Sequence, residues 1–274
     1  MDKMIGECLD ANALRDMFKS LEHVKILGDF CIDKFARNPL TVYRYMQYRW
    51  AKELVLSKKV AFKNPQKWED PFENRFACGD YHAIGFAPKR MACLCVTTEH
   101  GENEAAFWRS FDPNANRDMV QLTLDFGVLL KALDDFGREH NVTVYVEACD
   151  YSYTSDELKS SGENLFLKNV QEFDDNSFIK LMGLKRRAFK YEKELRFIIY
   201  GDNLPFEGDF VNVPYTGRLV RALKVCPNPD VGAFLSTDGI ATALRDFYKE
   251  KNVAIKVEQS RLYDKVSNFK LKGK

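Results

Sequence analysis

Polar and apolar residues alternate in several short segments of the chain, and other segments repeat apolar residues at helical spacing. The first pattern predicts strands and the second predicts helices. The predicted strands span residues 41–46, 60–62, 91–97, 119–126, 142–151, 190–200, 210–213, 219–225 and 255–263. The predicted helices span residues 9–24, 49–57, 104–111, 127–140 and 231–249, with a mostly helical region over 154–184.

Short connections without a helix join several of these strands. They favour a mixed, largely antiparallel sheet with packed helices over a regular parallel array, and the predicted fold class is therefore α+β. No linker or internal repeat divides the 274 residues, so we expect one α+β domain over residues 1–274. Residues 1–38 are predicted to form a helical N-terminal extension, and the Lys-rich residues 265–274 a frayed tail.

Charged residues begin the strand predicted over residues 190–200. In an extended backbone Glu192, Glu194 and Arg196 lie on one face. The same face becomes apolar from Ile198 onward, which indicates burial on both faces beyond Arg196. Two interpretations stay open for this rim of a buried sheet: a reactive site, or a strand end held by salt bridges.

The strand predicted over residues 41–46 carries an arginine between aromatic residues. Tyr43 and Tyr45 share one face, which offers either an aromatic shelf for a ligand or ordinary packing between strands. Arg44 takes the other face between apolar neighbours. An arginine in such a place needs a carboxylate or phosphate partner to offset the loss of water.

Two further segments contain candidate binding residues. Asp70-Pro71 forces a turn, and either Asp70 and Glu73 face a cleft or the loop only fixes nearby aromatic residues to the core. The basic run 185–187 favours a solvent-exposed face, with phosphate binding as the alternative. The aromatic residues around Trp108 favour a core position over a stacking site.

Composition excludes several classes of function. The chain has 41 basic and 40 acidic residues, so its net charge gives no case for nucleic-acid binding. It shows no signal-peptide pattern and no apolar run of about 18 residues, which predicts a cytoplasmic protein without a membrane partner. Seven scattered cysteines fit reduced thiols, and the isolated histidines disfavour a metal site. A Gly-rich dinucleotide motif and a P-loop are both absent, so any nucleotide binding uses another scaffold.

The order of these segments resembles a family of bacterial domains of unknown function, often found near phage-defence or abortive-infection genes. The resemblance covers about residues 40–200 and rests on Asp-Pro-Phe-Glu at 70–73 and Tyr-Glu-x-Glu-x-Arg at 191–196. The chain departs from that family at Glu69, where the family usually has Asn.

The same layout is similar to the ADP-ribosyltransferase superfamily, which implies a split β-sandwich and NAD as a substrate. By this resemblance Arg44 matches the first-strand residue, Glu194 the glutamate at the NAD ribose, and Glu192 the glutamate on the acceptor side. Thr97-Thr98 is the nearest candidate for the middle serine or threonine element. The predicted catalytic residues are therefore Glu194, Glu192 and Arg44, and the predicted NAD-binding residues are Arg44, Tyr43, Tyr45, Arg196, Asp70 and Glu73.

The resemblance implies an NAD-consuming, ADP-ribosyltransferase-like enzyme that modifies a protein or nucleic acid as an anti-phage or toxin effector. It also implies a partner protein from a defence operon. The alternative from another class is a non-enzymatic binding or sensor module of a defence system, in which the charged strand is structural. A nuclease is the third interpretation, although residues 156–159 only imitate a metal-binding motif on a predicted helix.

Overall fold

The computed structural model describes residues 16–27, 41–98, 104–111, 118–160, 173–227 and 237–262. Within these residues one sheet contains eleven strands. They are β1 (Val24–Leu27), β2 (Thr41–Gln47), β3 (Lys59–Lys63), β4 (Met91–Thr97), β5 (Met119–Asp125), β6 (Thr143–Ala148), β7 (Glu194–Tyr200), β8 (Phe206–Glu207), β9 (Phe210–Pro214), β10 (Val220–Val225) and β11 (Lys256–Gln259).

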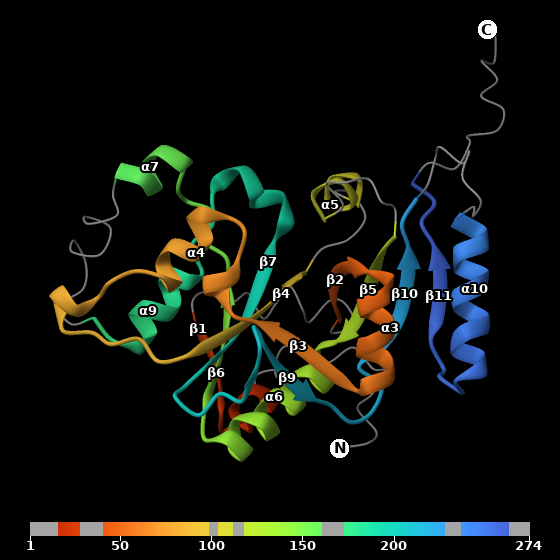
Figure 1. Cartoon of the computed structure of the whole chain (residues 1–274), viewed down its shortest axis with the longest axis horizontal. Coiled ribbons are helices and arrows are strands. Elements are labelled where there is room, and N and C mark those ends of the chain that lie inside the picture. Colours follow the sequence, from red (N-terminus) through yellow and green to blue (C-terminus); the bar gives the residue numbers. More distant parts are fainter. Residues whose placement is uncertain are drawn as a thin grey trace, which may run out of the picture.

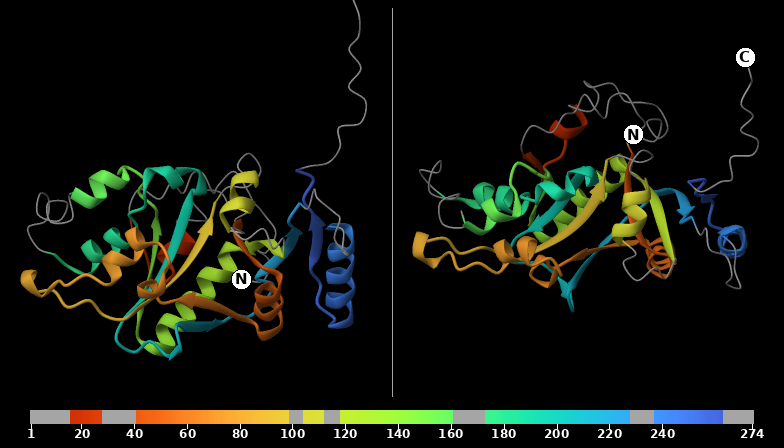
Figure 2. Two further views of the ribbon diagram at one scale, coloured as in Figure 1. Left: turned by 45° about the horizontal axis from the view of Figure 1, so that its top comes forward. Right: turned by 90° about the horizontal axis from the view of Figure 1, so that it is seen from above.

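Helices cover the sheet and its ends. The α-helices are α3 (Tyr48–Ser57), α4 (Pro71–Ala77), α5 (Glu104–Phe111), α6 (Phe126–His140), α7 (Ser155–Ser160), α9 (Asp175–Met182) and α10 (Thr237–Glu250). The short 3-10 helices are η1 (Pro65–Lys67), η2 (His82–Ile84) and η3 (Arg187–Glu192). In Figure 1 the helices α4, α7 and α9 gather at one end of the molecule and α10 lies at the other, and both views of Figure 2 agree.

The order of strands along the sheet is β1-β6-β7-β4-β2-β5-β10-β11. The β1–β6 and β10–β11 pairs are parallel, and the other neighbouring pairs are antiparallel. The strands β3, β9 and β8 branch off this path. A mixed, largely antiparallel sheet with packed helices confirms the predicted α+β class.

The sheet splits beside β4. One edge of β4 pairs with β7 along its whole length, from Met91 to Thr97. The other edge pairs with two different strands at one position each: Thr97 with Tyr43 of β2, and Cys93 with Lys63 of β3. The strands β2 and β3 therefore diverge from β4 and leave an opening between these two positions.

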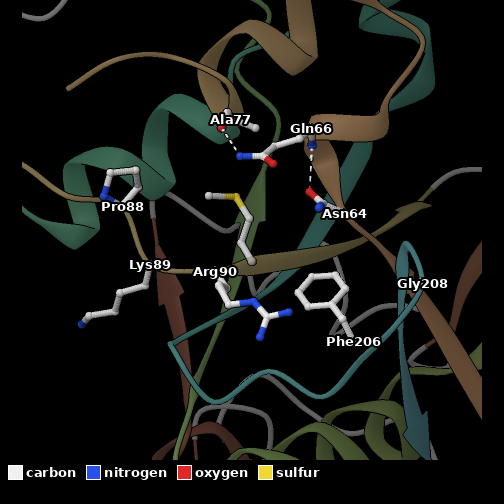
Figure 3. Close-up of a pocket in the computed structure, with 9 residues that line it drawn as sticks. Asn64, Gln66, Ala77, Pro88, Lys89, Arg90, Phe206 and Gly208 are labelled. Atoms are coloured by element: carbon white, nitrogen blue, oxygen red, sulfur yellow. Dashed lines mark hydrogen bonds between the residues drawn. The ribbon is translucent and has the colours of Figure 1, made fainter. Parts of the chain in front are cut away.

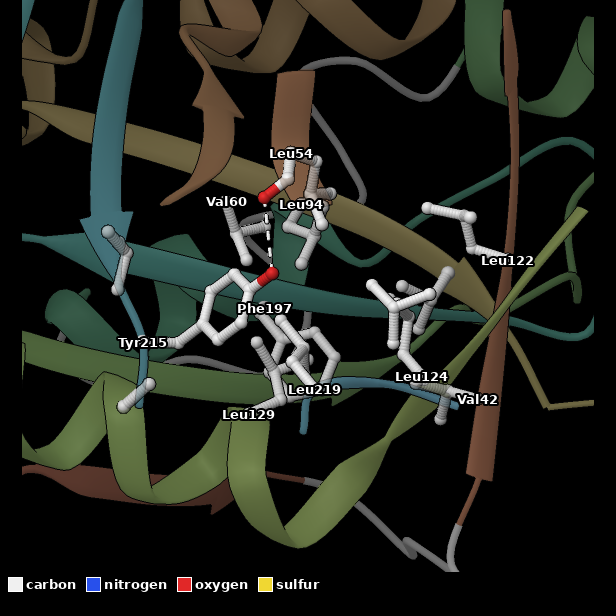
Figure 4. Packing of buried hydrophobic residues seen from close by; sticks show 14 of the residues in the cluster. Val42, Leu54, Val60, Leu94, Leu122, Leu124, Leu129, Phe197, Tyr215 and Leu219 are labelled. Carbon is white, nitrogen blue, oxygen red and sulfur yellow. Dashed lines mark hydrogen bonds between the residues drawn. The ribbon is translucent and has the colours of Figure 1, made fainter. Parts of the chain in front are cut away.

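One core cluster packs the strands against α3 and α6, and a second cluster packs the other face of β7, with Ile198 and Tyr200, against α4 and α9. All seven residues of β7 are buried, which confirms the predicted burial on both faces of this strand. Figure 4 shows Phe197 of β7 packed among residues of other elements, including Leu124 of β5 and Leu129 of α6. The buried Tyr215 donates a hydrogen bond of 3.1 Å to the carbonyl oxygen of Leu54, so its hydroxyl group is satisfied inside the core.

Local signals explain where two important helices begin. Asp70 caps α4 by accepting a hydrogen bond of 2.9 Å from the backbone N–H of Phe72, and Pro71 occupies the first helical position. Asp125 caps α6 in the same way through the N–H of Val128. The predicted turn at Asp70-Pro71 is thus the start of a helix.

Two sequence predictions differ from the structure. Within the described part of the predicted helix 9–24, residues 16–19 are helical, and β1 begins at its last residue, Val24. The predicted helical extension 1–38 therefore contains a strand, Val24–Leu27, which pairs with β6. Glu192 was predicted on the strand with Glu194, but it ends the 3-10 helix η3, and Lys193 adopts a left-handed conformation with φ 44° before β7 begins. The tail 265–274 lies outside the described residues. Among the described residues, every helix is too short or too polar to cross a bilayer.

A buried glutamate lies between the sheet and α9. Glu147 of β6 stands opposite Arg196 in the strand register, is 7% exposed, and has an Oε2 atom without a hydrogen-bond partner in the described part of the chain. A Cβ atom at Gly183 would lie 2.7 Å from Glu147 Cγ, so only glycine permits this approach. Burial raises the pKa of Glu147 to about 7, and Lys180 only partly opposes the change.

We predict that Glu147→Gln removes a pH-dependent loss of stability. Between the ordinary glutamate pKa of 4.5 and about 7, the folded protein keeps a proton that the unfolded chain releases, so stability falls as the pH rises through this window. The variant should resemble the wild type near pH 4.5 and exceed its free energy of unfolding by about 2–3 kcal/mol near pH 8. Urea unfolding at both pH values measures this difference, and an equal difference at both would contradict it.

Candidate functional site

A pocket with a volume of about 360 Å³ lies where the sheet splits. Its walls come from β2, β3, β4, β7, α5 and the segments around η1, α4 and η3. The lining residues include Tyr43, Arg44, Tyr45, Lys63, Trp68, Glu69, Glu73, Cys93, Cys95, Thr97, Phe107, Phe111, Lys185, Glu192 and Glu194. Of the residues predicted as catalytic, all three line this pocket.

Arg44 extends from β2 across the opening toward β3. Its Nη1 atom donates one long hydrogen bond, of 3.4 Å, to the carbonyl oxygen of Ala61. No carboxylate among the described residues forms an ion pair with it. Burial lowers the pKa of Arg44 to about 10, so the guanidinium remains charged at neutral pH while much of its water is lost. The partner that the sequence required for Arg44 is thus not a side chain of the described protein.

Lys63 adds a second positive charge to the same wall. It ends β3 at the position where that strand meets Cys93 of β4. Within the described ranges Lys63, like Arg44, has no acidic partner in an ion pair. Two cations without acidic partners in the described part of the chain therefore face the pocket from β2 and β3, which is the charge pattern of an anion-binding wall.

The opposite wall is acidic, and its carboxylates are fully paired. Glu194 Oε1 lies 2.6 Å from Arg196 Nε, and Glu194 Oε2 lies 2.5 Å from Lys185 Nζ. The backbone N–H of Glu194 donates a hydrogen bond of 2.8 Å to the hydroxyl oxygen of Tyr151. The first residue of β7 is thus fixed through both its side chain and its backbone.

The same cations reach two more glutamates. Lys185 Nζ lies 2.5 Å from Glu192 Oε2 and 3.3 Å from Glu73 Oε1. Arg196 Nη2 lies 2.6 Å from Glu73 Oε2. The network of Glu73, Lys185, Glu192, Glu194 and Arg196, which we call the charge cluster, joins α4, η3 and β7. It brings Glu192 beside Glu194 although the two residues do not share a strand.

The two glutamates at the pocket differ in their affinity for protons. Burial alone would raise the pKa of Glu194, but Arg196 and Lys185 outweigh it and hold that pKa well below the ordinary value. Burial raises the pKa of Glu192, and Lys185 alone among the cations opposes it by direct contact. Glu194 therefore stays ionised, whereas Glu192 is the better proton acceptor. Neighbouring carboxylates with diverging pKa values are typical of acid–base sites.

Arg196 and Asp70, both predicted to bind NAD, do not line the pocket. Arg196 is 1% exposed, packs over Trp68 at 4.8 Å, and donates a hydrogen bond to the carbonyl oxygen of Met182. Asp70 caps α4 and pairs with Arg186 at 2.5 Å. Both residues support the pocket wall from behind, and any contact of either with a ligand stays a prediction.

Aromatic residues form the third side of the pocket. Tyr45 is buried, stacks on Phe107 with ring centroids 5.0 Å apart, and accepts a hydrogen bond from Gln121. Tyr43 is more open, and burial raises the pKa of its hydroxyl group. Phe111 lies parallel to Tyr45 at 5.6 Å and is 43% exposed. Tyr45 is thus packed on the core side, while Tyr43 is half-buried and Phe111 is exposed.

Sequence patterns did not identify every lining residue. Lys185 was expected on a solvent-exposed basic face, but it is buried in the charge cluster, so that expectation was wrong. Of the cysteines at the pocket, Cys93 is buried, and the partly exposed Cys95 lies at the opening between β2 and β3. Trp108 is in the core as expected. The sequence did not mark Lys63 as a binding residue, because a lysine at the end of a strand is usually exposed to solvent.

A second hollow, of about 240 Å³, lies near the branch of the sheet formed by β8 (Figure 3). Gln66 crosses its edge and donates a hydrogen bond of 3.0 Å to the carbonyl oxygen of Ala77. Lys89 is paired with Asp175, and Arg90 stacks over Phe206. Lys89 is thus paired and Arg90 is exposed to solvent, so this hollow lacks a buried cation like Arg44. No group of three or more potential metal ligands occurs among the described residues.

The fold and pocket define a mixed α+β protein with a polar cavity at a split in its sheet. No family model matches the chain, and no curated protein matches it either. Among solved structures, Thermus sp. 2.9 DarT in complex with NAD+ is similar at 9% identity and a TM-score of 0.35, covering 82% of this chain and 96% of that chain. Thermus sp. 2.9 DarT in complex with ADP-ribosylated ssDNA has 10% identity, a TM-score of 0.34, and coverages of 81% and 95%. At such low values the likeness assigns neither a fold family nor an activity.

We predict that replacing the two buried arginines changes the free energy of unfolding by very different amounts. Arg196→Met should lower the free energy of unfolding by about 3–5 kcal/mol, because it leaves the three glutamates of the charge cluster, Glu73, Glu192 and Glu194, to share the single cation of Lys185. Arg44→Met should change it by less than about 1 kcal/mol or raise it, because no described carboxylate loses a partner. Urea unfolding at neutral pH compares the two variants. An equal cost for both would mean that Arg44 is a structural partner and not a free cation.

Proposed function

We propose that this protein is an NAD-consuming, ADP-ribosyltransferase-like enzyme. The proposal is supported above all by the distribution of charge in the pocket. Arg44 and Lys63 face it without an acidic partner among the described residues, and Glu192 and Glu194 face it from the other side. NAD has a matching distribution of charge, with an anionic diphosphate and a cationic nicotinamide ring.

The diphosphate would bind at Arg44 and Lys63. A guanidinium that has already lost water binds phosphate oxygens at little further cost, and the anion offsets the burial of the charge. The open ring of Tyr43 would pack against nicotinamide. This arrangement directs the nicotinamide ribose toward Glu194 and leaves the acidic wall beside the positive ring.

Transfer would break the bond between nicotinamide and ribose C1′. The bonding electrons leave with nicotinamide, which becomes neutral, and positive charge develops on the ribose. Glu194, held ionised by Arg196 and Lys185, would stabilise this charge and orient the 2′-hydroxyl group. Because both its oxygen atoms are fixed, the carboxylate needs little rearrangement during the reaction.

Glu192 would take up the proton of the acceptor. As the acceptor's nucleophilic atom forms a bond to ribose C1′, its proton passes to the Glu192 carboxylate, whose pKa is raised by burial. The acceptor is a protein or a nucleic acid. NAD serves as a substrate, and no metal takes part in these steps.

The biological role that we propose is that of an anti-phage or toxin effector, with a partner protein encoded in the same defence operon. It is supported by the resemblance of residues 70–73 and 191–196 to motifs of a family found near phage-defence genes.

One observation favours a second candidate function. Both carboxylate oxygens of Glu194 are occupied by buried cations, as in a purely structural cluster. A non-enzymatic binding or sensor module would use Arg44 and Lys63 to hold an anionic ligand and would leave the charge cluster to support the wall.

We predict that Glu194→Gln abolishes catalysis and that Glu147→Gln does not. Both glutamates are 7% exposed, but only Glu194 lines the pocket, so the second variant controls for replacing a buried glutamate outside the pocket. Nicotinamide release from NAD, with label transfer to protein, RNA and DNA fractions, should fall by about 100-fold or more in Glu194→Gln. No release by the wild type, together with a melting temperature raised by NAD, would favour the binding module.

We also predict that Arg44→Met weakens the binding of NAD by about 10–100-fold, because a charge-assisted hydrogen bond is lost. Lys59→Met is the matched control, since Lys59 is exposed on β3 and does not line the pocket. Isothermal titration calorimetry measures both affinities. Equal affinities for the two variants would exclude Arg44 from the binding site.

A further inference from the structure

Lys185 occupies an unusual position for a residue in a basic run. It follows the end of α9, and its backbone N–H donates a hydrogen bond of 2.9 Å to the carbonyl oxygen of Asp150. Leu184 beside it forms an isolated bridge with Asp150. The side chain is buried and points into the pocket wall, whereas Arg187 remains exposed. The backbone is thus fixed so that one ammonium group enters the charge cluster.

A single ammonium group contacts carboxylates from three elements. Lys185 Nζ lies 2.5 Å from Glu192, 2.5 Å from Glu194 and 3.3 Å from Glu73. Arg196 contacts Glu194 and Glu73 but forms no ion pair with Glu192 within the described residues. Lys185 is therefore the cation that holds Glu192 in place and the one that joins it to Glu194.

We propose that Lys185 is a positioning residue that holds Glu192 and Glu194 together at the pocket and determines which of them accepts the acceptor's proton. The inference rests on the proposed transferase function and assigns to that site a residue that neither the motifs nor the resemblance identified. An ammonium group is a compact charge with three donors, so it can contact several carboxylates at one point, unlike a planar guanidinium.

The charges around Glu192 explain this selectivity. The titratable and charged groups that face Glu192 or the charge cluster are Glu73, Lys185, Glu194, Arg196, Cys95, Cys149 and Tyr151. Glu194 has two cations in contact and Glu192 has one, so the two carboxylates respond differently to the loss of Lys185. Without Lys185, Glu192 would keep burial and two acidic neighbours as the main influences, and all three favour its protonated form.

The test measures the proton affinity of Glu192 directly, without a substrate. Carbon-13 NMR follows the carboxyl signal of Glu192 through a pH titration, and the signal is assigned by its absence in Glu192→Gln. In Lys185→Met the pKa of Glu192 should rise by about one unit or more relative to the wild type. In Lys185→Arg, which keeps the charge, it should rise by less than half as much. An unchanged pKa in Lys185→Met would overturn the proposal.

A charge-balanced pair of variants covers the case in which Lys185→Met does not fold. The cluster contains three carboxylates and two cations. Removing one of each, as in Glu73→Gln with Lys185→Met, leaves its net charge unchanged. The pKa of Glu192 in this double variant is compared with that in Glu73→Gln alone, and the same rise is expected. Equal values in the two would again overturn the proposal.

Enzyme kinetics then separates this inference from the proposed function. If the wild type releases nicotinamide, the rise of kcat with pH should shift to higher pH in Lys185→Met by the amount seen in the NMR titration, with KM for NAD changed less than kcat. A shifted pKa without any activity in the wild type would uphold the effect of Lys185 on Glu192 and reject the transferase. Activity with an unshifted pH profile would retain the transferase and reject the role of Lys185.

Discussion

The ion pairs of Lys185 and Arg196 with three glutamates are the interaction on which the pocket depends. They connect three elements between which no strand pairing exists among the described residues: the helix α4, the 3-10 helix η3 and the start of β7. Burying these charges costs solvation free energy, and only their dense mutual pairing offsets that cost. The cluster adds little net stability compared with an apolar core of equal size, but it fixes the direction in which each carboxylate points.

The charged side chains on the two walls of the pocket are paired to different extents. On the acidic wall every glutamate of the cluster has a cation within 3.3 Å. On the basic wall Arg44 has only a long hydrogen bond to a carbonyl group, so its burial is poorly compensated by the described residues. Natural proteins keep such unfavourable groups mainly where function requires them. The basic wall is therefore the part of the molecule where the proposed binding of an anion would offset the cost of burying Arg44.

Sequence patterns located the elements better than the site. The strand 91–97 and the helix 104–111 were predicted with their observed limits, because apolar and β-branched periodicity is a local signal. The split beside β4 depends on pairing between distant segments, and no local pattern encodes it.

Glu192 was predicted on a strand because its alternation with Glu194 looked extended, whereas Lys193 between them adopts a left-handed backbone conformation. Lys185 was missed because a basic run is usually solvated, and its burial depends on three glutamates from other elements. Motif order nevertheless led to Arg44, Glu192 and Glu194, which the fold brings to one pocket.

The narrow contact between β2 and β4 has a mechanical consequence. Only Tyr43 and Thr97 pair across this boundary, so few backbone hydrogen bonds connect the two halves of the sheet there. Side chains carry the remaining connection, among them the hydrogen bond of 2.5 Å between Ser110 and Tyr191 that joins α5 to η3. The boundary between β2 and β4 is thus easier to deform than the parts of the sheet on either side of it. A ligand bound in the pocket, as proposed above, would contact both parts of the sheet and restrict their motion relative to each other.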